Sequence, residues 1–99
     1  MKIDLHCHTK KTKSGDPDTR NVTSELFCQK IMDAVIKIAA ITNHNHFDFT
    51  QYIDFSEKVK SHCQVWPGIE LDVINSVKKR WHLVVVANPS KAKEFDDAI

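Results

Sequence analysis

Short apolar segments alternate with longer amphipathic segments along the chain, and this alternation limits the folds that it can adopt. Residues 2–8, KIDLHCH, alternate apolar and polar side chains with a period of two, which indicates a short strand. An order of strand, helix, strand and helix favours an α/β fold built on a parallel sheet or barrel. The later segments predict helices at 22–40 and 49–62, strands at 38–42, 63–73 and 81–89, and a further helix after Asn88-Pro89.

Two of the predicted strands carry additional signals. Strand 63–73 contains Pro67 followed by Gly68, and we expect this pair to interrupt the strand. Segment 81–89, WHLVVVANP, is apolar over most of its length, which is typical of a strand buried on both faces of an α/β sheet. We therefore expect 81–89 to lie in the interior of the sheet.

Length and composition limit the class of protein. The 99 residues suffice for one domain at most, and a net charge of +1 does not indicate a nucleic-acid partner. No segment approaches the length of a transmembrane span, so we expect no membrane partner. The three cysteines are an odd number without a CxxC pair. They indicate reduced thiols and a cytoplasmic location.

Histidines gather at the predicted strand ends. His6 and His8 close the first strand, and because alternate strand residues share a face, the two imidazoles point the same way. Such a pair can bind a divalent metal such as Zn, Mn or Fe. His44 follows the second strand and Glu70 lies in the third. His82 begins the fourth strand, so it joins the same edge only if that strand runs antiparallel, which its short connection favours.

Other polar residues have simpler interpretations. His46 fits a surface loop and His62 a helix end, while strand geometry turns Cys7 away from the paired histidines. Two interpretations stay open for the basic residues beside the site: they bind a phosphate, or they belong to a solvated loop. These residues are Lys10, Lys11, Lys13 and Arg20.

Four motifs together resemble the PHP family, the polymerase and histidinol phosphatase superfamily. They are DLHCHT, ITNHN, PGIELDV and HLVVVA, at residues 4–9, 41–45, 67–73 and 82–87. The resemblance implies a distorted (β/α)7 barrel with two or three divalent metal ions. PHP domains are considerably longer and supply a further His and a final Asp-x-His motif. The resemblance therefore implies that residues 1–99 are the N-terminal part of such a domain.

The resemblance also assigns roles to individual residues. It implies that His6 and His8 bind one metal, that Glu70 bridges two metals, and that His82 binds the second. His44 would bind a third metal with a residue of the first loop, for which Asp16 is the candidate and Asp18 the alternative. The resemblance also implies catalytic roles for Glu70 and His44.

One departure from the family pattern concerns Asn43, where PHP proteins usually have Asp. Asn cannot act as a base or carry a charge, so this position favours a chain without catalysis. Two functions are therefore open. The first is metal-dependent hydrolysis of a phosphorylated small molecule or nucleotide. The second is a metal-binding or interaction module without activity.

The expected partners follow from the same resemblance. Relatives carry the PHP domain fused to polymerase or ATPase modules, so the chain could belong to such a protein. A nucleic-acid partner is a weaker alternative, because the net charge of +1 does not favour it. An open half-barrel would also expose strand edges, which favours a homodimer.

Overall fold

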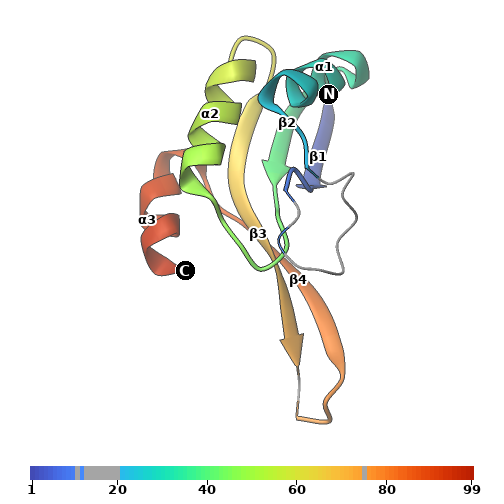
Figure 1. The fold of residues 1–99 in the computed structure, drawn as a ribbon, viewed down its shortest axis with the longest axis vertical. Helices are drawn as coiled ribbons and strands as arrows, with labels where there is room; N and C mark the ends of the chain where they lie inside the picture. Colours follow the sequence, from blue (N-terminus) through green and yellow to red (C-terminus); the bar gives the residue numbers. More distant parts are fainter. Residues whose placement is uncertain (11, 13–20, 75) are drawn as a thin grey trace.

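The computed structural model describes residues 1–10, 12, 21–74 and 76–99 of the chain. Its centre is a curled, half-barrel sheet of four strands in the order β1-β2-β3-β4 (Figure 1). The strands are β1 (Lys2–Cys7), β2 (Ile36–Ile41), β3 (Gln64–Ile74) and β4 (Arg80–Val86). The helices are α1 (Ser24–Ala34), α2 (Phe49–Val59), the short 3-10 turn η2 (Pro89–Lys91) and α3 (Ala92–Ala98).

Strand direction follows the length of each connection. β1, β2 and β3 are mutually parallel, and each parallel step is made through a helix. β4 returns antiparallel to β3 after a short turn. The α/β class and the antiparallel return of the fourth strand, both predicted from the sequence, are confirmed.

The hydrophobic core lies on one face of the sheet, beneath the helices. α1 supplies Phe27, and α2 supplies Phe55, whose ring centroid lies 5.1 Å from that of Phe27. Thr23 caps α1 by accepting a hydrogen bond from the Leu26 amide at 3.1 Å, which satisfies one of the free donors of the first turn. The remaining buried members of the core are Ile31, Ala39, Ile41, Tyr52, Val59, Cys63, Val65 and Ala92.

The first helix is shorter than the sequence pattern predicts. It ends at Ala34, and β2 begins at Ile36, so the helix predicted over 22–40 is wrong after residue 34. Val35 takes a left-handed conformation with φ 56°, and its amide donates to the carbonyls of Ile31 and Met32 to close the helix. Pairing of β2 between β1 and β3 then outweighs the helical spacing of Ile38.

The third strand is continuous, so the predicted interruption at Pro67-Gly68 is wrong. β3 pairs with β2 up to Pro67 and with β4 from Gly68 onward, which places the proline where one partner replaces the other. Gly68 is required by close packing. A Cβ atom there would lie 2.8 Å from Thr42 Cγ2 and 3.0 Å from the Val85 carbonyl oxygen.

The fourth strand is exposed, contrary to the expectation that it is buried on both faces. Trp81 is 52% exposed and Leu83 49% exposed, because β4 is an edge strand and the far end of β3 and β4 projects as a two-stranded hairpin (Figure 1). An apolar sequence can therefore form an edge strand as well as a central one. None of the described helices has the length and apolar character needed to cross a membrane.

Candidate metal centre

The parallel strands place the histidines at one edge of the sheet. β1 ends with His6 and Cys7, and His8 follows directly. Beyond β2, His44 forms a parallel bridge with Glu70. Two backbone hydrogen bonds fix this bridge: the Asn45 amide donates to the Glu70 carbonyl at 2.7 Å, and the Glu70 amide donates to the Asn43 carbonyl at 3.0 Å. Backbone pairing alone therefore places His44 beside Glu70.

Glu70 lies at the centre of a first group of candidate ligands, which we define as His6, His8 and Glu70. Its Oε2 atom lies 2.7 Å from Nε2 of His6 and 2.7 Å from Nε2 of His8. The Glu70 side chain is only 6% exposed, while that of His6 is 51% exposed. The first group therefore has a buried carboxylate with one imidazole open to solvent.

The environment of Glu70 keeps its carboxyl group charged. Burial alone would raise the pKa of Glu70, but hydrogen bonds with His6 and His82 and the nearby charges of His6 and His8 outweigh it. Together they lower the pKa of Glu70 to about 2. At neutral pH the group is therefore an anion, which is the form that binds a metal ion.

A second group of candidate ligands consists of His44, Asp72 and His82. Nε2 of His44 lies 2.6 Å from Oδ1 of Asp72, and Nε2 of His82 lies 3.5 Å from the same oxygen. His82 enters the group because it pairs directly with Asp72 across the antiparallel strands. The ligand atoms of each group lie within 4.8 Å of one another, so each set can converge on a single ion.

His82 connects the two groups. Its Nδ1 atom lies 2.8 Å from Oε1 of Glu70, while its Nε2 atom faces Asp72. The imidazoles form a continuous row, with ring centroids 5.1 Å apart for His6 and His8, 6.5 Å for His8 and His44, and 5.5 Å for His44 and His82. Two histidines and one carboxylate per group match the ligand sets of catalytic zinc and non-heme iron sites. The donor sets therefore fit the divalent ions that the sequence predicts.

Five of the six predicted metal ligands lie together in the two groups. His6, His8, Glu70 and His82 adjoin as expected. His44 lies beside Asp72 and His82 in the second group. The sixth predicted ligand, Asp16, lies outside the described residues, as does its alternative Asp18.

Sequence reasoning missed Asp72. The signal was present, because Glu70 and Asp72 are two residues apart in one strand and so share a face. Only the pairing of Asp72 with His82 and its 2.6 Å contact with His44 reveal a second carboxylate in the site.

Asn43 has a structural role, because its side chain makes several hydrogen bonds. Its Oδ1 atom accepts hydrogen bonds from the amides of Thr9 at 2.7 Å and Lys10 at 3.0 Å, and its Nδ2 atom donates to Gln51 Oε1 at 3.0 Å. These bonds tie the chain after β1 to β2 and α2. The side-chain amide of Asn43 is buried, and both its oxygen and its nitrogen are hydrogen-bonded, so Asn43 holds together the segments that follow β1 and β2.

Of the four basic residues next to the site, only Lys10 is described. Its Nζ atom lies 3.0 Å from Oδ2 of Asp48, the residue that caps α2. Lys10 therefore holds the loop against that helix. Lys11, Lys13 and Arg20 lie outside the described residues.

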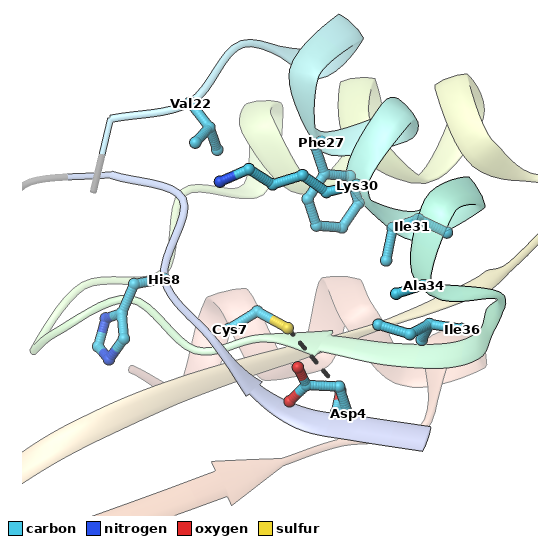
Figure 2. A pocket seen from close by; sticks show the side chains of 9 residues that line it. All are labelled: Asp4, Cys7, His8, Val22, Phe27, Lys30, Ile31, Ala34 and Ile36. Atoms are coloured by element: carbon cyan, nitrogen blue, oxygen red, sulfur yellow. Dashed lines mark hydrogen bonds between the residues drawn. The ribbon is translucent and has the colours of Figure 1, made fainter. Parts of the chain in front are cut away.

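Cys7 lies on the other side of β1 from the candidate ligands. Figure 2 shows its thiol directed into a cavity under α1, close to Asp4, while the imidazole of His8 points away from that cavity. The cavity has a volume of about 270 Å³. Burial raises the pKa of the Cys7 thiol to about 12, and the charge of Asp4 adds to this effect. Cys7 is thus a neutral packing residue, as its place in the strand predicts.

Comparison with protein-family models and with curated proteins gives no match from which a function could be transferred. No protein-family model matches the chain, and no curated protein matches it. Membership of the PHP family is therefore a hypothesis that rests on four sequence motifs and on the two adjoining ligand groups.

Proposed function

We propose that the chain carries the metal centre of a PHP-type, metal-dependent phosphoester hydrolase. The observation that carries this proposal is the position of Glu70. One of its oxygens contacts the two imidazoles of the first group, and the other contacts His82 of the second group. A carboxylate that joins two His-rich ligand groups is the arrangement expected for a pair of adjoining divalent ions.

The ligand types restrict the metals. Imidazole nitrogens and carboxylate oxygens suit Zn, Mn and Fe, and the described part of the site offers four imidazoles and two carboxylates. Bound ions would polarise a phosphoryl group and lower the pKa of a metal-bound water from about 15.7 toward about 7. The protein residues would supply fixed ligands, with Glu70 already charged at neutral pH.

A nearby guanidinium supports a phosphorylated substrate. Arg80 is two residues before His82 on β4, so the two side chains extend from the same face of the strand. Arg80 is exposed and makes no ion pair with any described residue. A guanidinium on the strand face that carries His82 can bind a phosphate oxygen, because its donors match phosphate geometry.

The test combines metal loading with hydrolysis. The chelator-treated chain is loaded with Mn²⁺ or Zn²⁺ and assayed with p-nitrophenyl phosphate and bis(p-nitrophenyl) phosphate, alongside His8→Ala. The control is His62→Ala, an exposed histidine outside both ligand groups. We expect metal-dependent hydrolysis that His8→Ala abolishes and that His62→Ala leaves unchanged. Hydrolysis unaffected by chelation or by His8→Ala would contradict the proposal.

The second candidate is a metal-binding module without catalysis. It is favoured by the exposure of the outer imidazoles, since the side chains of His6 and His82 are 51% and 59% exposed. The described residues thus leave the site open to solvent on that side. Stoichiometric metal binding without hydrolysis of either phosphoester would select this candidate over the hydrolase.

A further inference from the structure

We infer that the far end of the β3–β4 hairpin docks on an anionic lipid surface. The sequence predicted no membrane partner because no segment is long enough to cross a bilayer. Docking at the surface needs only a few side chains that enter the headgroup layer, so that length does not limit it. The inference depends neither on the metal centre nor on hydrolysis. We define the hairpin tip as Val73, Ile74, Val77, Lys78, Lys79 and Trp81.

The hairpin tip lies at one end of the molecule. The longest extent of the molecule is 45 Å, and Figure 1 shows the turn between β3 and β4 at the lower end of this axis, away from the helices. The described part of the chain can therefore bring the hairpin tip against a flat surface while the helices stay clear of it.

Apolar side chains extend from both faces of the hairpin tip. Val73 pairs directly with Trp81, so the two side chains share one face, where they are 37% and 52% exposed. Ile74 extends from the opposite face and is 63% exposed, and Val77 in the turn is 76% exposed. A groove on a partner protein would bury one face of such a ribbon, whereas a lipid layer surrounds the ribbon and buries both.

The charge of the hairpin tip is positive. Lys78 and Lys79 are exposed, and segment 73–81 contains no acidic residue. Nζ of Lys79 lies 5.6 Å from the centroid of the Trp81 ring, so a cation and an amphipathic ring lie together. At a membrane surface the ring enters the interface while the lysine stems keep their ammonium groups at the level of the headgroups. These cations complement anionic lipid.

Single-stranded nucleic acid is the alternative ligand for a lysine pair beside a tryptophan. Its phosphates could contact Lys78 and Lys79, but they would leave Ile74 and Val77 in water. A lipid surface pairs with the same lysines and also buries the two apolar side chains, which favours lipid. The next cation along the chain, Arg80, extends from the face of His82, so the test changes only the lysines.

Vesicle binding tests this inference. The chain is sedimented with vesicles of phosphatidylcholine alone, and with vesicles of phosphatidylcholine and phosphatidylserine in equal parts. A chelator is present throughout, so that no metal ion can join the protein to a headgroup phosphate. The variants are Val77→Asp, which places a negative charge in the turn, and the double variant Lys78→Gln/Lys79→Gln.

Matched controls change exposed residues outside the hairpin. Val35→Asp alters a valine that is 57% exposed, at a left-handed position that Asp tolerates. Lys30→Gln/Lys37→Gln removes two exposed lysines. Circular dichroism of every variant confirms that it is folded before its binding is compared.

We expect the unmodified chain and both controls to bind the mixed vesicles at least about tenfold more tightly than phosphatidylcholine alone. Val77→Asp should weaken binding to mixed vesicles by about tenfold or more, because it removes apolar burial and adds repulsion. The lysine variant should lose about fivefold for each lysine. Equal binding to the two kinds of vesicle would overturn the inference, as would an affinity of Val77→Asp within about twofold of the unmodified chain.

Tryptophan fluorescence reports whether the hairpin tip enters the lipid. The chain has two tryptophans, so Trp66→Phe leaves Trp81 as the only one. Its emission should move to shorter wavelengths when mixed vesicles are added, because the ring leaves water. Unchanged emission from vesicle-bound chain would contradict the inference. A single-stranded oligonucleotide that binds more tightly than the mixed vesicles, and equally well to Val77→Asp, would assign the lysines to nucleic acid and overturn it as well.

Discussion

The two faces of the curled sheet differ in what they contribute. The face under the helices carries Ala39, Ile41 and Val65, all at most 3% exposed, and it holds the core. The opposite face of β3 carries Glu70 and Asp72, the two carboxylates of the candidate metal centre. Because neighbouring residues of a strand point to opposite faces, one short segment serves both purposes.

This difference implies that stability and metal binding can be changed separately. The core is closed by apolar contacts between the helices and the sheet, whereas the outer imidazoles of the metal face are open to solvent. Substitutions on the helix face should therefore lower the free energy of unfolding, and substitutions of the outer imidazoles should lower metal affinity. The following predictions, from the largest expected effect to the smallest, test where this separation holds.

Phe55→Ala should have the largest effect on folding. Phe55 is 4% exposed and packs against Phe27, so its truncation removes buried area and leaves a cavity. We expect a loss of about 3–5 kcal/mol in the free energy of unfolding, measured by urea denaturation in the presence of a chelator. The control on the opposite face is Arg80→Ala, which removes an exposed side chain of β4 and should change that free energy by less than about 0.5 kcal/mol. Equal losses in the two variants would break the comparison.

Gly68→Ala should affect both faces at once. The added Cβ would lie 2.8 Å from Thr42 Cγ2 and 3.0 Å from the Val85 carbonyl oxygen, so the strands must move apart. We expect a loss of about 1–3 kcal/mol in the free energy of unfolding. Because Gly68 is two residues before Glu70, we also expect weaker Zn²⁺ binding by calorimetry. An unchanged Zn²⁺ affinity in a destabilised variant would show that the faces are independent even here.

Asp48→Asn should have the smallest effect, and it should depend on pH. The hydrogen bond from the Gln51 amide and the nearby Lys10 hold the pKa of Asp48 below its ordinary value, despite partial burial. A lowered pKa in the folded state contributes stability above about pH 4 that is lost as the pH falls through the folded value. Asn still caps the helix, so we expect a loss of up to about 1 kcal/mol at pH 7.

The measurement is urea denaturation from pH 7 to pH 2, with Asp54→Asn as the control on the same helix. The difference between the unmodified chain and Asp48→Asn should shrink toward zero at the acid end, because the carboxyl group is then protonated in both states. A difference that stays constant over this range would exclude charge at Asp48 as its cause.

Local sequence patterns predicted which helices and strands form better than they predicted the residues at which these elements begin and end. α2 was predicted over 49–62 and forms at Phe49–Val59, because its apolar spacing and its cap at Asp48 agree. The first helix was predicted too long, because 35–38 continue the helical spacing while pairing with β1 and β3 makes the segment from Ile36 a strand. Burial of β4 was predicted from its apolar composition, but composition cannot distinguish a central strand from an edge strand.

The sequence by itself determined five of the side chains that could bind metal, but not Asp72, and it determined which strand face the paired histidines share. His6, His8, Glu70 and His82 were predicted as neighbours, because strand periodicity and the direction of each connection can be inferred locally. Only the tertiary structure decided how the ligands are grouped. The contact of Asp72 with His44 depends on the register between strands that are far apart in sequence. That register is set by the packing of the whole sheet, because no single segment contains both partners.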